Sequence, residues 1–97
     1  MTKDLFSTSD TGNLSARQKK ILFRAWHRGT READLLMGRF ADSFVPHASE
    51  DDLGLFEDVL NETDPDIYDW VTGRLPLPAN DFNCILHAMI AFYKVAS

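Results

Sequence analysis

Cysteine, proline and glycine are scarce in this sequence, and it contains no long hydrophobic run. The 97 residues include 1 Cys, 4 Pro and 5 Gly. The single cysteine, Cys84, excludes a disulfide framework and fits a reducing compartment. No apolar stretch approaches the roughly 20 residues of a membrane span, and no secretory signal is recognisable. We therefore expect a protein of the bacterial cytoplasm with no membrane partner.

Motifs for metal binding and catalysis are also missing. His27, His47 and His87 are too widely spaced to form a zinc site with Cys84. No glycine-rich loop follows a strand pattern, which excludes a dinucleotide fingerprint and a P-loop. We expect Cys84 in the core, on the apolar side of the last helix, where no base accompanies it. The sequence thus predicts neither an enzyme nor a metal site.

The chain does contain helical periodicity. Residues 1–13 are polar and aperiodic, and we predict a disordered lead-in there. Residues 14–97 form a single helical domain in this interpretation, because five amphipathic patterns follow one another and no segment alternates as a strand would. The sequence therefore predicts an all-α fold, a small five-helix bundle.

The ends of these helices are marked by capping and terminating residues. Gly29, Pro46 and Gly73 are expected to end the first, second and fourth helices. The last helix is expected over about residues 80–95. The first four helices are expected to begin at residues that can cap them: Ser15, Thr30, Ser49 and Asp64, the last followed by Pro65.

Charge is divided unevenly along the chain. The formal net charge is −5, with +3 in residues 1–48 and −8 in residues 49–97. The basic excess gathers in residues 15–31, which hold six Lys or Arg and no acid. Three interpretations stay open: a solvated helix face, a nucleic-acid-binding helix, or a surface for an acidic protein partner. Acids such as Glu32 and Asp34 in the next helix weaken the nucleic-acid interpretation, because phosphates repel carboxylates.

The junction of the first two helices carries the string Arg28-Gly29-Thr30-Arg31-Glu32. Glycine commonly ends a helix, and a glutamate in a first turn is favoured by the helix dipole. Gly29 also lets a partner backbone approach closely, and the flanking charges can form charge-assisted hydrogen bonds. The junction is therefore the candidate binding surface.

Two sequence blocks resemble the FAD assembly factors, or flavinators, of succinate dehydrogenase. That family is recognised by Arg-Gly-x-x-Glu between its first two helices, with an Asp two residues later. Arg28, Gly29, Glu32 and Asp34 match this first block. The second block, Asp-x-Asp-apolar-aromatic-x-Trp, matches residues 64–70, and a Pro-Ala element matches residues 78–79. The resemblance covers about residues 15–95.

The resemblance implies a five-helix bundle that binds the flavoprotein subunit of succinate dehydrogenase or of its fumarate reductase relative. It implies that the chain promotes covalent attachment of FAD to a histidine of that subunit. FAD is then the cofactor of the partner, and none is bound stably here. Neither nucleic acid nor membrane is a partner in this interpretation. The alternative is a small regulatory protein that binds nucleic acid through its basic first helix.

The resemblance also implies roles for residues of the first block. Arg28 and Glu32 would make polar contacts with the partner, and Gly29 would permit its close approach. Arg31 and Asp34 would flank this contact.

Residues of the second block would shape the adjoining surface. Asp66 and Tyr68 are the candidates there, while Trp70 is expected in the core because aromatic residues on a helical stripe usually are buried. One departure from the family pattern is His27, which stands where many members have a second arginine.

Overall fold

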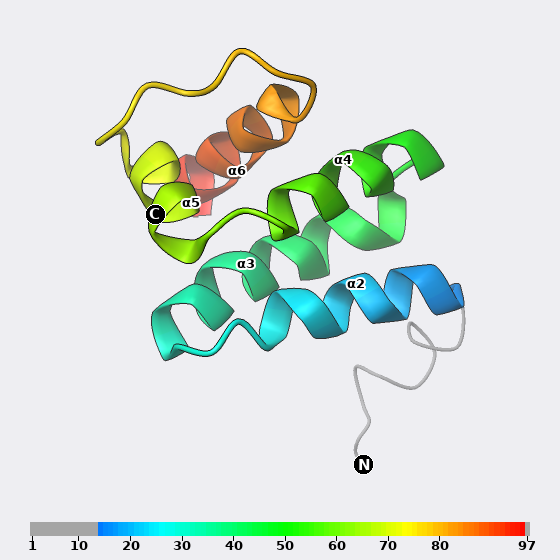
Figure 1. Cartoon of the computed structure of the whole chain (residues 1–97). Coiled ribbons are helices and arrows are strands. Elements are labelled where there is room, and N and C mark those ends of the chain that lie inside the picture. The colour runs from blue at the N-terminus through cyan, green and yellow to red at the C-terminus, as the bar shows by residue number, and fades with distance from the viewer. Residues whose placement is uncertain (1–13, 97) are drawn as a thin grey trace.

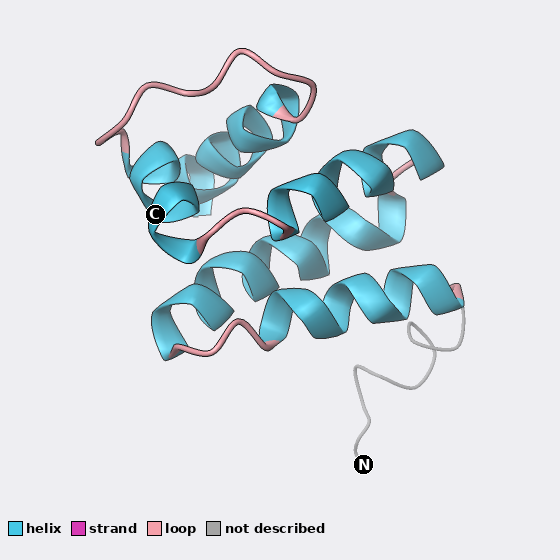
Figure 2. Cartoon of the chain, viewed as in Figure 1, coloured by secondary structure: helices cyan, strands magenta, loops and turns pink. Residues whose placement is uncertain are grey.

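The structure, a computed structural model, describes residues 14–96, and its regular structure is helical throughout (Figures 1 and 2). The elements in chain order are α2 (Ala16–Trp26), α3 (Arg31–Phe44), the 3-10 turn η1 (Val45–His47), α4 (Glu50–Leu60), α5 (Asp64–Thr72) and α6 (Asn83–Ala96). The predicted all-α bundle of five helices is confirmed. The predicted lead-in, residues 1–13, lies outside the described residues.

Three of the predicted caps are present. The side chains of Ser15, Thr30 and Ser49 each accept a hydrogen bond from the backbone N–H three residues on. At Ser15 the Gln18 side chain also accepts from the backbone N–H of Ser15 at 2.7 Å, which completes a capping box. Such caps satisfy N–H groups that have no acceptor within the helix.

The fourth predicted cap is wrong by one residue. Thr63 caps α5, because its hydroxyl accepts from the backbone N–H of Asp66 at 3.3 Å, and Asp64 is the first helical residue. The Asp64 carboxylate is bonded instead to a distant arginine, Arg28.

Two predicted helix boundaries also differ from those in the structure. The first helix ends at Trp26, so Gly29 lies in the following loop and not at the helix end. The last helix begins at Asn83, because residues 80–82 form a turn that the Asn83 N–H closes on the Asn80 carbonyl at 3.2 Å. Gly73 ends α5 as predicted, with a left-handed φ of 85°.

The core lies where the helices meet. Helix α2 packs on α3 and α4, α3 on α5, and α6 on α4 and α5. Removal of these apolar side chains from water is the main stabilising contribution. The largest fully buried side chains are Phe56, Ile21, Met37, Leu53, Ile67, Leu86, Met89, Val45 and Val59.

The expected burial of Cys84 is wrong, since this residue is exposed. The buried stripe of α6 runs through Ile85, Leu86 and Met89, and Cys84 falls outside it. Trp70 is partly buried and packs against Phe82, with ring centroids 6.0 Å apart.

Helices α2 and α3 approach closely at Gly38. The Trp26 ring lies over this glycine, so that a Cβ there would stand 2.2 Å from Trp26 Cδ2. The indole Nε1 donates to Asp42 at 2.9 Å. This packing holds the two helices side by side and leaves their junction, residues 27–30, at one end of the pair (Figure 1).

Candidate functional site

Arg28 joins the two sequence blocks that point to function. Its Nε donates to the Asp64 carboxylate at 2.7 Å, Nη1 to the Leu60 carbonyl at 2.7 Å and Nη2 to the Glu62 carbonyl at 2.9 Å. The Arg28 side chain is only 11% exposed. The guanidinium therefore fastens the α2–α3 junction to the loop between α4 and α5, using its planar set of donors.

Asp34 shapes the backbone of the junction from within. Its Oδ1 accepts from the N–H groups of Arg28 at 2.5 Å and Gly29 at 3.3 Å. Gly29 has a φ of 117°, a backbone conformation that residues other than glycine rarely adopt. A Cβ at this position would meet nothing within 4 Å. Gly29 thus allows the backbone to turn here, and the space beside its Cα stays open.

Arg31 and Glu32 are both exposed at the start of α3. Neither side chain has a hydrogen-bond or ion-pair partner within residues 14–96. Their charges are therefore available to a molecule that approaches the junction, whereas those of Arg28 and Asp34 are engaged.

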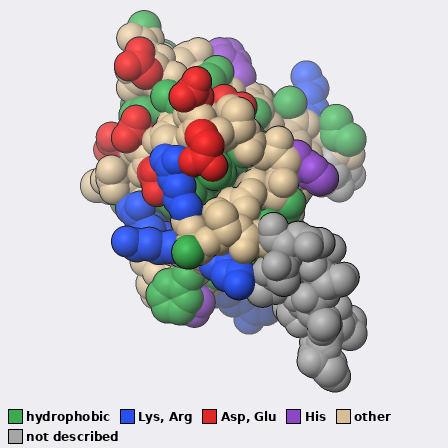
Figure 3. Space-filling model, turned by 90° about the vertical axis from the view of Figure 1, so that its right-hand side faces the viewer, with side chains coloured by type: hydrophobic (Ala, Val, Ile, Leu, Met, Phe, Trp, Pro, Cys, Tyr) green, Lys and Arg blue, Asp and Glu red, His purple; other side chains and the backbone are tan. Residues whose placement is uncertain are grey.

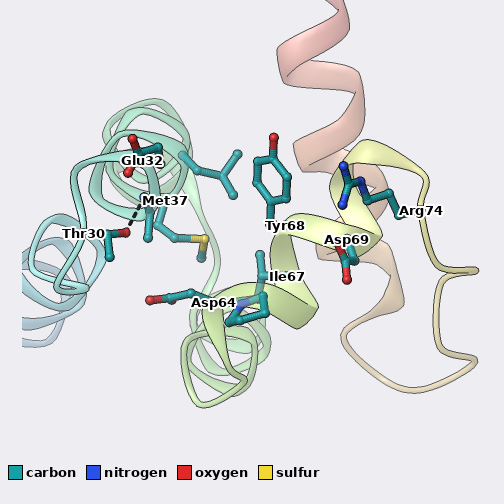
Figure 4. Close-up of a pocket in the computed structure, with 11 residues that line it drawn as sticks. Thr30, Glu32, Met37, Asp64, Ile67, Tyr68, Asp69 and Arg74 are labelled. Atoms are coloured by element: carbon teal, nitrogen blue, oxygen red, sulfur yellow. Dashed lines mark hydrogen bonds between the residues drawn. The ribbon is translucent and has the colours of Figure 1, made fainter.

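A groove of about 630 Å³ separates the start of α3 from α5 (Figure 4). Glu32 lies on one wall and Tyr68, which is 47% exposed, lies on the other. Asp66 does not line the groove, although the first and second blocks both contribute to it. The lining residues are Thr30, Glu32, Ala33, Leu36, Met37, Asp64, Pro65, Ile67, Tyr68, Asp69 and Arg74.

His27 and Phe23 form an exposed pair beside the junction. Their rings stack at a centroid distance of 3.9 Å, and His27 Nδ1 hydrogen bonds the Phe23 carbonyl at 2.8 Å. Phe23 is one of the exposed large apolar residues of the described chain.

Two of the four basic residues of α2 are engaged within the fold. Arg17 pairs with Glu50 at 2.6 Å and Glu57 at 2.7 Å, and Arg24 donates to Asn61 at 2.8 Å. The hydrogen bonds to Glu57 and Glu50, that to Glu57 foremost, raise the pKa of Arg17, and the bond from Arg17 lowers the pKa of the Glu57 carboxyl. On the face shown in Figure 3, basic and acidic side chains gather in adjoining regions.

Residues 14–96 contain no cluster of three or more His, Cys, Asp or Glu that would hold a metal ion. None of their helices has both the length and the apolar character needed to cross a membrane.

Sequence reasoning found the residues of the junction but missed the acceptors of Arg28. Two of these are main-chain carbonyls of Leu60 and Glu62, which no side-chain pattern marks. The one available signal was the Asp64 carboxylate in the second block, and the sequence assigned it to a helix cap.

Comparison with known proteins places these features in a family. A family model described as "Flavinator of succinate dehydrogenase" matches residues 19–93. The chain is 40% identical over 78 residues to the FAD assembly factor SdhE of Acetobacter pasteurianus, with 80% of this chain and 72% of that protein covered. No solved structure matches it.

Two mitochondrial proteins named succinate dehydrogenase assembly factor 2 are also similar. The one from Komagataella phaffii is 33% identical over 72 residues, which cover 71% of this chain and 38% of the relative. The one from Drosophila grimshawi is 34% identical over 67 residues, which cover 67% of this chain and 46% of the relative. The chain thus spans less than half the length of these two relatives. The match over residues 19–93 and the bacterial relative confirm the resemblance read from the two blocks: the chain belongs to the flavinators of succinate dehydrogenase.

Proposed function

We propose that this chain is an assembly factor that binds the flavoprotein subunit of succinate dehydrogenase, or of fumarate reductase, and promotes its covalent attachment to FAD. The observation that carries the proposal is the bond between Arg28 and Asp64, which brings both family blocks to one surface. Exposed charges with no partner among the described residues and an apolar groove lie side by side there. We place this activity in the bacterial cytoplasm, since the SdhE relative is bacterial.

The residues of the junction divide into two roles in this proposal. Arg31 and Glu32 contact the partner through their free charges, and Gly29 permits its backbone to come close. Arg28 and Asp34 position these residues, because their polar atoms are bonded within the chain. This assigns Arg28 a supporting role in place of the direct contact that the resemblance implied.

The proposed mechanism is positional. A bond between the flavin and a histidine of the partner forms readily only when the two groups are held in one orientation. A helper that binds the competent arrangement of a mobile partner raises its population. The chain need not supply a catalytic group for this, and we propose that FAD is held by the partner.

The nucleic-acid alternative receives little support from the charges. Of the six basic side chains between Ser15 and Glu32, those of Arg17, Arg24 and Arg28 are bonded within the fold. That leaves three bases, Lys19, Lys20 and Arg31, without a partner within residues 14–96, whereas phosphate binding typically uses a dense basic patch.

A gene deletion tests the proposal. Covalent flavin on the flavoprotein subunit is measured by in-gel fluorescence in the parent, the deletion strain and the complemented strain. We expect the signal to fall in the deletion strain and to return with the wild-type gene. An Arg31→Ala/Glu32→Ala double variant should restore less signal than an Asp58→Ala control, which alters an exposed acid of α4. Unchanged flavin in the deletion strain would contradict the proposal.

A further inference from the structure

The groove between α3 and α5 is apolar inside. Its floor is formed by Ala33, Met37 and Ile67, all of which are buried, and its walls include Leu36 and Tyr68. The volume of about 630 Å³ lies in the range of about 300–1,000 Å³ that ligand sites occupy. An apolar side chain placed there would be removed from water on most sides.

Two hydrogen bonds anchor elements that form the walls of this groove. Near the start of α5, Arg28 bonds Asp64 and so links α5 to the α2–α3 junction. Farther along α3, the Tyr93 hydroxyl of α6 donates to the Leu36 carbonyl. Because the groove exists before a partner arrives, little binding energy is spent on ordering it.

The charges at the rim of the groove favour the binding of a basic group. Among its acids, Asp64 is paired with Arg28, whereas Glu32 and Asp69 have no side-chain partner within residues 14–96. Arg74 is the one basic residue that lines it. Glu32 and Arg74 lie on opposite sides of the groove in Figure 4, and no ion pair joins them within the described residues.

We infer that this groove receives an apolar side chain from a segment of the flavoprotein subunit, and that a Lys or Arg beside it in that segment pairs with Glu32. The inference rests on the proposed function and adds to it the chemistry of the partner segment. An apolar interior with an acidic rim selects such a segment, since burial supplies affinity and complementary charge supplies selectivity.

Binding measurements with the isolated flavoprotein subunit test the inference. Tyr68→Ala removes one wall, and Glu32→Lys reverses the charge of the rim. We expect each variant to bind about tenfold more weakly than the wild type, as truncation of a central interface residue does. Glu32→Lys should also reduce the dependence of the affinity on salt. The matched controls are Leu75→Ala, which alters a residue of similar exposure (42% against 47%), and Asp58→Lys, and both should bind as the wild type does.

Cross-linking identifies the segment that enters the groove. The photoreactive p-benzoylphenylalanine replaces Tyr68, and the linked partner peptide is sequenced after irradiation. A peptide in which an apolar residue adjoins Lys or Arg supports the inference. A peptide without this pair overturns it, and so does the absence of a link in a complex that still forms.

The outcomes separate the inference from the proposed function. If the wild-type chain fails to bind the flavoprotein subunit, the proposed function fails and the inference with it. If the wild type binds and the Tyr68 and Glu32 variants, shown to be folded by circular dichroism, bind equally well, the inference alone is wrong. It is also wrong if the wild type forms a dimer that Tyr68→Ala dissociates, because a second copy would then fill the groove.

Discussion

Nε of Arg28 lies 2.7 Å from the carboxylate of Asp64, although 36 positions separate the two residues in sequence. This single contact connects the loop that ends α2 with the first turn of α5. The carbonyl of Leu60, the last residue of α4, and that of Glu62 in the following loop complete the acceptor set of the same guanidinium. The exposed surface of the site is therefore built on a mostly buried arginine.

Replacement of Arg28 should destabilise the fold. Arg28→Ala leaves the Asp64 carboxylate and two partly buried carbonyls without a donor, and we expect a loss of about 2 to 4 kcal/mol in the free energy of unfolding. Arg28→Lys should lose about 1 to 2 kcal/mol, because an ammonium group cannot reach all three acceptors. Urea unfolding measures both values. The exposed Arg31→Ala serves as control, and a loss from Arg28→Ala no larger than that of the control would show that the bonds contribute nothing.

The Asp34 carboxylate should contribute more to the free energy of unfolding than the carboxylate of Glu32, which lies in the same first turn of α3. Asp34→Ala removes the acceptor for the N–H groups of Arg28 and Gly29, and we expect a loss of about 1 to 2 kcal/mol. Glu32→Ala removes only an exposed charge near the helix N-terminus, worth about 0.5 kcal/mol. Equal losses in chemical denaturation would argue against a role of Asp34 in shaping the turn.

Gly38→Ala should disturb the contact between α2 and α3. The added Cβ would overlap the Trp26 ring, which must then move and give up its hydrogen bond to Asp42. We expect a loss of about 1 to 3 kcal/mol and a change in tryptophan fluorescence. Gly54→Ala is the contrasting variant, because a Cβ there meets only Arg17 Nη2 at 3.4 Å. It should gain up to about 1 kcal/mol from helix propensity, and an equal gain at Gly38 would refute the close packing.

Glu57 should give stability a defined dependence on pH. The hydrogen bond from Arg17 lowers the pKa of the Glu57 carboxyl below its ordinary value of 4.5, against the opposing effect of partial burial. A carboxyl whose pKa is lower in the folded than in the unfolded state stabilises the fold above its unfolded pKa. This contribution is lost as the pH falls through the folded pKa.

Urea unfolding of the wild type and Glu57→Gln between about pH 7 and pH 3 checks this dependence. The wild type should be the more stable at neutral pH, and the difference should shrink once the pH falls below about 4.5. A difference that stays constant over the whole range would mean that the Arg17–Glu57 pair does not affect folding.

The features that the sequence predicted correctly are those set by local chemistry. Ser15, Thr30 and Ser49 cap helices through backbone groups only three residues away, so their roles are visible in a short stretch of sequence. Thr63 and Asp64 can both cap α5, and the choice between them depends on Arg28, which occupies the Asp64 carboxylate. Cys84 is adjacent in sequence to Ile85 and Leu86 but lies outside the buried stripe that these residues form with Met89, a distinction that depends on how α6 packs.

Some residues of the candidate site stand in blocks that the sequence marks, but their arrangement could not be predicted. Gly29 and Glu32 stand in a recognisable block, and the structure places both on the surface. The groove between Glu32 and Tyr68 exists only because α3 packs against α5, a relationship between segments that no single stretch encodes. The contact of these residues with a partner stays a prediction, which the binding experiments test.

The arginines that fasten α2 also fix how many residues it must contain. Arg17 and Arg24 stand seven positions apart, so at about 100° per residue they share one face of the helix, and Arg28 follows in the loop after it. Each is bonded to α4 or to the loop that follows α4. Inserting one residue between Arg17 and Arg24 would rotate one end of α2 by about 100° relative to the other, and both ends could not then keep their partners. The solvent side of α2 is thus free to vary in sequence, whereas insertions and deletions within it are excluded.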